Sequence, residues 1–193
     1  EKMQYKAILF DLGNTLIHFT GNWSHVFSMA DRRLSEYLID MGIYVNPETF
    51  PVKFRQRTMQ YHAQREIDFI EHTTTNLLID VLRELGHQNI SQSDISLALE
   101  QSYKQSQKYW IPEENAVSIL EALKSRCYKL GIISNASNDA DVQLLVDKVK
   151  IGHLFDFVLS SAHFGIRKPS PLIFEEALSQ WPQVEPSQVV MVG

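Results

Sequence analysis

The chain has 193 residues, and its 18 Lys and Arg against 23 Asp and Glu give a formal net charge of −5. Proteins that follow a nucleic-acid backbone carry a clear basic excess, so this charge argues against a dedicated nucleic-acid-binding protein. With 44% hydrophobic and 21% charged residues, the composition is typical of a folded protein with a packed core, and the length allows one domain with a large insertion.

The cysteine content and the hydropathy indicate the compartment. The single cysteine, Cys127, excludes an internal disulfide framework and is typical of a reducing environment. No apolar run approaches the roughly 18 residues that a membrane span requires, and the polar start at residues 1–6 is not followed by a signal-type apolar stretch. We therefore expect a cytoplasmic protein without a membrane partner.

Four short apolar runs predict buried strands. They have no polar alternation, which is typical of parallel strands covered by helices on both faces. The runs lie at residues 7–10, 130–133, 157–159 and 189–192. Between the last three runs lie segments of helical periodicity, with Val142 and Leu145 in the first and Ile173 and Ala177 in the second. This alternation predicts an α/β fold with a doubly wound parallel sheet.

The stretch from about Trp23 to Trp110 interrupts this pattern, because it contains no comparable strand-like run. Apolar stripes at residues 26–38 and 78–85 predict amphipathic helices, and Ser93 is expected to cap a further helix. We therefore predict an all-helical insertion between the first and second strands.

The residues that follow the predicted strands are the candidate functional residues. In an open α/β sheet, ligands bind beyond the carboxyl ends of the strands, near the point where the strand order reverses. Asp11 follows the first run and Ser134 the second, while Lys168 lies in the loop after the third. Each residue alone also has a structural interpretation, as a turn residue, a helix cap and a solvated loop lysine respectively.

Together, a carboxylate, a hydroxyl and an ammonium at one sheet edge are suited to phosphoryl transfer. Asp11 can act as a nucleophile that forms an aspartyl-phosphate. Lys168 and a bound Mg²⁺ can compensate the charge of the phosphate. Ser134 and the backbone N–H groups after it can hold the phosphate oxygens.

Four segments of this sequence resemble the motifs of the haloacid dehalogenase-like hydrolase superfamily. They are residues 10–16 (FDLGNTL), 131–135 (GIISN), 167–174 (RKPSPLIF) and 189–193 (VVMVG). The resemblance covers the whole chain. It implies a Rossmann-like core made of residues 1–18 and 112–193, with one more strand and helix expected after Gly193, and an α-helical cap made of residues 19–111.

The resemblance also implies roles for individual residues. Asp11 would be the nucleophile and Lys168 the charge-neutralising cation. Ser134, Asn135 and Thr15 would bind the substrate phosphate. Mg²⁺ would be held by the carboxylate of Asp11 and the backbone carbonyl of Gly13.

Two features depart from the pattern of the family's phosphatases. Gly13 stands where they usually have a second Asp that protonates the leaving group, a contribution worth ~10² to 10⁴ in rate. The acidic Mg²⁺ ligands of the fourth motif would follow Gly193. Residues 1–193 alone therefore supply too few oxygen ligands for an ion that prefers six. We expect a slow enzyme, one that takes substrates with good leaving groups, or one that uses an acid from the cap.

Three functions are compatible with these residues. The first is a Mg²⁺-dependent phosphatase acting on a small phosphorylated metabolite, which the Val-Gly ending at 192–193 favours. The second is a 2-haloacid dehalogenase, a branch that also lacks the second Asp and needs no metal. The third is a catalytically impaired pseudoenzyme that serves as a binding module, which Gly13 favours.

Other candidate residues are weaker. The seven histidines form no metal-ligand spacing, although His18, just past the first motif, could donate the missing proton. One basic stretch contains Arg55, Arg57 and Arg65. We interpret it as a solvated helix face and not as a binding site for an anionic substrate.

Overall fold

The computed structural model describes residues 5–193, and its contacts divide the chain into two compact units. The first, here called the α/β unit, contains residues 5–20, Phe69–Glu71 and Trp110–Gly193. The second, the helical unit, contains Gly21–Asp68 and His72–Tyr109. Within the range 19–111 expected for the cap, the α/β unit contains Phe19, Thr20, Phe69–Glu71, Trp110 and Ile111.

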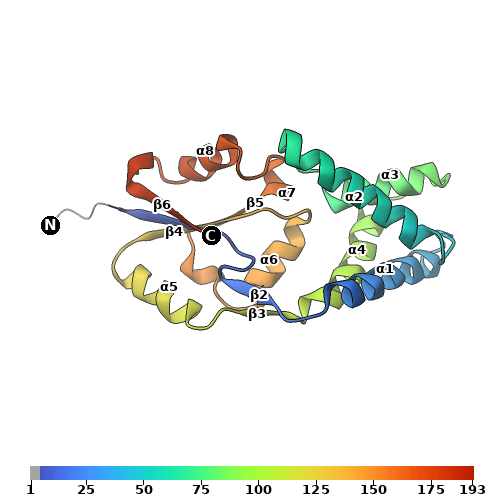
Figure 1. Ribbon diagram of the computed structural model, residues 1–193, viewed down its shortest axis with the longest axis horizontal. Helices are drawn as coiled ribbons and strands as arrows, with labels where there is room; N and C mark the ends of the chain where they lie inside the picture. The colour runs from blue at the N-terminus through green and yellow to red at the C-terminus, as the bar shows by residue number, and fades with distance from the viewer. Residues whose placement is uncertain (1–4) are drawn as a thin grey trace. The chain divides into compact units, whose positions relative to one another are not determined.

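The α/β unit is built on a parallel four-stranded sheet with the order β5-β4-β1-β6 (Figure 1). Its strands are β1 (Ala7–Phe10), β4 (Lys129–Ser134), β5 (Phe157–Ser160) and β6 (Val189–Val192). All three pairings are parallel, and Phe10 lies opposite both Ile132 of β4 and Val192 of β6. The chain builds outward on one side of β1 and then returns to its other side, so the strand order reverses at β1. The four apolar runs and the α/β fold class are confirmed.

Helices cover both faces of this sheet (Figure 1). They are α5 (Ala116–Ser125), α6 (Asp139–Lys148), α7 (Ser161–Phe164) and α8 (Pro171–Ser179), with 3-10 turns at Gly152–Leu154 and Pro186–Gln188. Successive strand residues point to opposite faces. Ile132 therefore packs with Leu120 of α5 in one core, while Ile133 packs with Ile173 of α8 in the other. Burial of the strands on both faces explains their uninterrupted apolar sequences.

Gly131 leaves room for a neighbouring side chain within the sheet. A Cβ atom at Gly131 would lie 2.4 Å from the ring of Phe157, its partner on β5. That ring in turn packs on Trp181, with 5.0 Å between ring centroids. A side chain at position 131 would therefore displace an aromatic pair from the core.

A two-stranded antiparallel ribbon was missed by the sequence analysis. It pairs β2 (Ile17–Phe19) with β3 (Trp110–Pro112), and Phe19 and Trp110 contact each other edge to face across it. Strands of three residues are too short to show a periodic pattern, which is why Trp110 read as part of the helical stretch.

The helical unit consists of α1 (Trp23–Asp40), α2 (Phe50–Asp68), α3 (Thr74–Glu84) and α4 (Gln92–Gln107). Its core is formed by apolar residues at helical spacing, among them Leu34, Leu38, Leu78, Leu82, Ile95 and Leu99. The expected cap at Ser93 is wrong: the hydroxyl of Ser91 accepts the N–H of Asp94, and Ser93 lies in the first turn of α4. Both serines precede the apolar stripe, and only the backbone geometry decides which one caps.

The basic stretch on α2 is occupied by ion pairs. Arg55 pairs with Asp31, and Arg57 pairs with Glu84, which also lies 3.0 Å from the ammonium of Lys53. Burial raises the pKa of Asp31 above its usual value, although the guanidinium of Arg55 opposes this effect. Arg55 and Arg57 thus lie on a solvated helix face, whereas the Arg65 side chain is 21% exposed and its guanidinium lies 5.6 Å from the centroid of the Tyr61 ring. Within residues 5–193, the helices are too short or too polar to cross a membrane.

Candidate active site

Asp11 lies at the carboxyl end of β1, where the strand order reverses. Its backbone N–H donates to Val192 O at 2.9 Å, and its Oδ1 accepts the N–H of Leu12 at 2.8 Å. The chain then makes a tight turn in which Leu12 O accepts the N–H groups of Leu16 and Ile17 at 2.9 and 3.1 Å. The strand and the turn together hold the Asp11 carboxylate at the edge of the sheet.

Lys168 is bound directly to this carboxylate. Its Nζ lies 2.9 Å from Asp11 Oδ1 and donates a hydrogen bond of 2.8 Å to the carbonyl of Ile133 on β4. The Lys168 side chain is 14% exposed and that of Asp11 is 32% exposed, so the pair is sheltered but reachable. Both of these side-chain contacts of Asp11 fall on Oδ1, and neither involves Oδ2.

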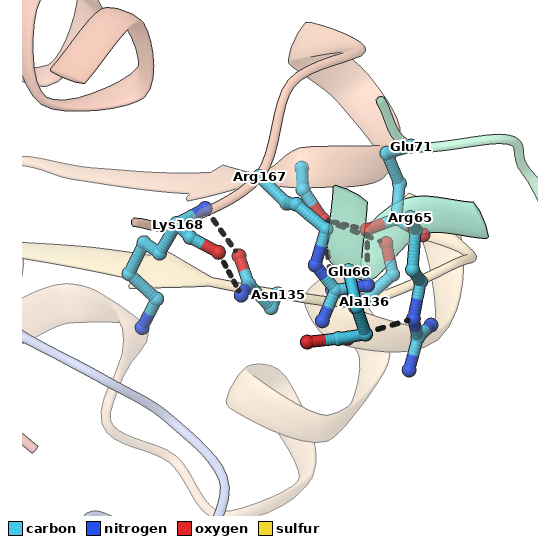
Figure 2. Close-up of polar contacts among 8 residues, drawn as sticks. Arg65, Glu66, Glu71, Asn135, Ala136, Arg167 and Lys168 are labelled. Carbon is cyan, nitrogen blue, oxygen red and sulfur yellow. Dashed lines mark hydrogen bonds and ion pairs between the residues drawn. The ribbon is translucent and has the colours of Figure 1, made fainter. Parts of the chain in front are cut away.

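The main chain of Lys168 is fixed by Asn135. Asn135 Oδ1 accepts the Lys168 N–H at 2.8 Å, and Asn135 Nδ2 donates to the Lys168 carbonyl at 2.9 Å (Figure 2). This pair of bonds joins the loop after β4 to the loop that carries the lysine. The observed contacts of Asn135 are those of a positioning residue, whereas its expected contact with phosphate stays a prediction.

Ser134 ends β4 at the same edge of the sheet. It is 6% exposed, and it lies opposite Ser160 in the register of β4 with β5. Since Phe10 pairs with Ile132, Ser134 and Asp11 both lie at the carboxyl ends of adjacent strands. The expected contact of the Ser134 hydroxyl with phosphate stays a prediction.

Thr15 and Gly193 complete the surroundings of Asp11. A Cβ at Gly193 would lie 2.6 Å from Asp11 Cβ and 3.4 Å from Thr15 Oγ1, and the φ of Gly193 is +148°. Glycine is therefore required both by the backbone angle and by the close approach. The end of β6 thus brings the fourth motif against the first.

Gly13 has space for a side chain. A Cβ at Gly13 would lie 3.6 Å from the Trp110 ring, which is an ordinary van der Waals contact. In the backbone hydrogen bonds of this turn, the acceptors are the carbonyl oxygens of Leu12 and Ile17, and the carbonyl of Gly13 accepts none of them. The missing acidic side chain is thus a feature of the sequence that the fold does not require.

The described residues supply only part of a metal site. Within residues 5–193, no group of three or more His, Cys, Asp or Glu side chains is placed to hold a metal ion. The Asp11 carboxylate and the Gly13 carbonyl would thus supply only part of the roughly six oxygen ligands that Mg²⁺ prefers. His18 lies on β2, where its Nδ1 is 3.1 Å from Glu113 Oε1, within ion-pair range but without hydrogen-bond geometry.

Glu71 is a residue near this site that the sequence analysis did not identify. Its side chain is fully buried, and its Oε2 accepts a hydrogen bond of 2.6 Å from Ser161 Oγ and lies 3.4 Å from Arg167 Nη1. Glu71 lies in the segment between α2 and α3, 96 positions from Arg167 in the sequence. Its only signal was a charged residue directly after the apolar pair Phe69-Ile70.

Comparison with known proteins relates the whole chain to one family. The family described as haloacid dehalogenase-like hydrolase matches residues 5–193. The glyceraldehyde 3-phosphate phosphatase of Methanothermobacter thermautotrophicus is 29% identical over 97% of this chain and 76% of its own length. Haloacid dehalogenase-like hydrolase domain-containing protein 3 of Bos taurus is 34% identical over 60% of this chain and 46% of its own length.

The solved structures of this fold agree. The 2-haloacid dehalogenase of Pseudomonas syringae superimposes with a TM-score of 0.61 at 23% identity, over 98% of this chain and 77% of that chain. The sheet order, the Asp11–Lys168 pair and the family match together lead to one conclusion. This chain belongs to the haloacid dehalogenase-like hydrolases.

Proposed function

We propose that this chain is a Mg²⁺-dependent phosphatase that hydrolyses a small phosphorylated metabolite through an aspartyl-phosphate on Asp11. The observation that carries the proposal is the ammonium of Lys168, held 2.9 Å from Asp11 Oδ1. The two relatives that match 97% of the chain support the choice of reaction, because both are named glyceraldehyde 3-phosphate phosphatase.

The positive charge of Lys168 makes the attack of one anion on another feasible. Asp11 Oδ2 attacks phosphorus, a new O–P bond forms, and the ester oxygen leaves with the electrons of the broken bond. Lys168 pairs with Asp11 and offsets the charge that accumulates on the phosphate oxygens. The Ser134 hydroxyl and the backbone N–H groups of its loop are assigned to those oxygens. Water then cleaves the acyl phosphate and restores Asp11.

Mg²⁺, when bound, would neutralise further phosphate charge, with the Asp11 carboxylate and the Gly13 carbonyl as its protein ligands. Gly13 offers no proton to the leaving oxygen, so in this proposal the leaving group takes its proton from water. The enzyme is therefore expected to prefer esters whose alcohols are good leaving groups. The helical unit is assigned the role of a cap that selects the substrate and excludes water.

The first experiment measures phosphate release from p-nitrophenyl phosphate, with Mg²⁺ and with a chelator. We expect release that depends on Mg²⁺, falls to background in Asp11→Asn, and persists in Asp40→Asn, a matched change at an exposed residue at the end of α1. Activity that survives Asp11→Asn would refute the covalent mechanism. The same assay with glyceraldehyde 3-phosphate, phosphoglycolate and a pyrimidine 5′-nucleotide, substrates that the relatives' names suggest, then ranks the metabolites.

A second candidate is hydrolytic dehalogenation of a 2-haloacid, which the absence of a side chain at Gly13 favours. In this reaction Asp11 Oδ2 attacks carbon, halide leaves with the bonding electrons, and no acid is needed. Halide release from 2-chloropropionate without metal, together with no phosphate release, would select it. If neither product forms and a beryllium fluoride adduct of Asp11 cannot be trapped, the chain is a binding module.

A further inference from the structure

Glu71 is a buried carboxylate that the proposed chemistry does not use. It lies in the segment Phe69–Glu71, which connects α2 to α3 but belongs to the α/β unit. Two backbone bonds fix this segment to the loop before Lys168: Arg167 N–H donates to Phe69 O, and Glu71 N–H donates to Gly165 O, each at 2.9 Å. The insertion thus contributes a short strand-like segment to the catalytic loop.

The carboxylate of Glu71 holds two partners from different parts of the α/β unit. On one side is Arg167, which directly precedes Lys168 and is itself 11% exposed. On the other side is Ser161 at the start of α7, whose hydroxyl also lies 3.1 Å from the carbonyl of Ala136. A hydroxyl has one proton, and the charged acceptor at 2.6 Å forms the stronger bond, so Ser161 donates to Glu71.

Ser161 extends the connection to the loop after β4. Its Oγ accepts the N–H of Ala136 at 3.0 Å, and Ala136 directly follows Asn135, which binds both backbone groups of Lys168. The contacts therefore close a ring around the lysine, part of which is drawn in Figure 2. In order, the ring runs through Glu71, Ser161, Ala136, Asn135, Lys168 and Arg167.

We propose that Glu71 is a positioning residue that holds the Lys168 loop in register with Asp11, by anchoring both the Arg167 side and the Ser161–Ala136 side of this ring. A buried carboxylate that bonds two loops at once fixes their relative position more strictly than either bond alone, because moving one loop leaves a charge unpaired in the interior. The placement of the lysine thus depends on a residue from the insertion. The expected effect of Glu71 on catalysis rests on the proposed function, whereas its anchoring of the Lys168 loop does not.

The structural part is tested by the accessibility of Lys168 to an amine-acylating reagent, measured by mass spectrometry on the folded protein. Glu71→Gln keeps the size of the side chain but removes its charge, and Ser161→Ala opens the ring on its other side. We expect the acylation rate of Lys168 to rise about threefold or more in Glu71→Gln, and to rise in the same direction in Ser161→Ala. The matched control is Glu121→Gln, a change at an exposed side chain on α5, which should leave the rate unchanged.

The catalytic part is tested by steady-state kinetics on p-nitrophenyl phosphate. A misplaced Lys168 should lower kcat about tenfold or more in Glu71→Gln with little change in KM, and Glu71→Asp should restore part of kcat. The proposal would be overturned if a folded Glu71→Gln protein had the same Lys168 acylation rate as the wild type. If Glu71→Gln does not fold, Ser161→Ala takes its place, and a wild-type acylation rate in that variant would overturn the proposal. A wild-type protein without phosphatase activity would refute the proposed function and leave the acylation result to decide the role of Glu71.

Discussion

Replacing Gly13 by Asp should convert this chain into a faster phosphatase. The backbone of Gly13 lies outside the left-handed region, and the nearest atom to an added Cβ is Trp110 Cη2 at 3.6 Å. The fold therefore accepts a Cβ atom here without moving its neighbours. Gly→Ala at such a compatible position stabilises a protein by about 0.4–1 kcal/mol through the unfolded state, so Gly13→Ala should raise the Tm by a few degrees.

The expected gain in rate comes from general acid catalysis. An Asp two residues after the nucleophile would share its turn with Asp11, and repulsion between the two carboxylates favours the protonated form that donates a proton. Positioned proton donation is worth ~10² to 10⁴ in rate. The gain should appear for alkyl phosphates, whose alkoxide leaves poorly, and should be small for p-nitrophenyl phosphate, whose phenolate leaves without help.

The assay compares kcat for glycerol phosphate and for p-nitrophenyl phosphate in Gly13→Asp, Gly13→Asn and Gly13→Ala. Gly13→Asn is the matched control, because it has the size of Asp but no acidic proton. The ratio of the two rates should rise about 10²-fold in Gly13→Asp alone. If Gly13→Asp folds normally and its ratio equals that of Gly13→Asn, then the absent acid is not what limits this protein.

Three further changes test the site and the fold. Lys168→Met should lower kcat by ~10² to 10³, because it removes one donor that stabilises the charge on the phosphate. The control Lys104→Met, on the exposed face of α4, should leave kcat unchanged, and equal kcat values in the two variants would exclude a catalytic role of Lys168. Gly131→Ala should lower the free energy of unfolding by ~1–3 kcal/mol, because the added methyl group overpacks against Phe157. Adding Phe157→Leu should recover most of this stability, and a double variant as unstable as Gly131→Ala would show that the strain lies elsewhere. Because burial raises the pKa of Asp31, the folded state binds its proton more tightly than the unfolded state does, so stability from this group is present below pH 3.8 and is lost as the pH rises through the higher, folded value. The Tm of Asp31→Asn relative to wild type should therefore increase from pH 3.5 to 6, and a constant difference in thermal unfolding scans would contradict this reasoning.

Local sequence was sufficient to predict the strands of the sheet and to single out Asp11 and Lys168. Strands buried on both faces need continuous apolar residues, so β1 and β4 were visible as short runs without an alternating pattern. Asp11 follows such a run directly, and Lys168 lies in a segment that resembles a motif of the haloacid dehalogenase-like hydrolases. These features depend on residues within a few positions of each other, which is the range over which sequence patterns carry information.

The remaining features were decided by tertiary structure. The order of the strands and the pairing of β2 with β3 depend on contacts between distant segments, which no local pattern encodes. The choice of Ser91 over Ser93 as the cap depends on backbone angles at two similar residues. Glu71 acquires its surroundings from Ser161 and Arg167, 90 and 96 positions away, because a buried charge is tolerated only where the fold brings its partners to it.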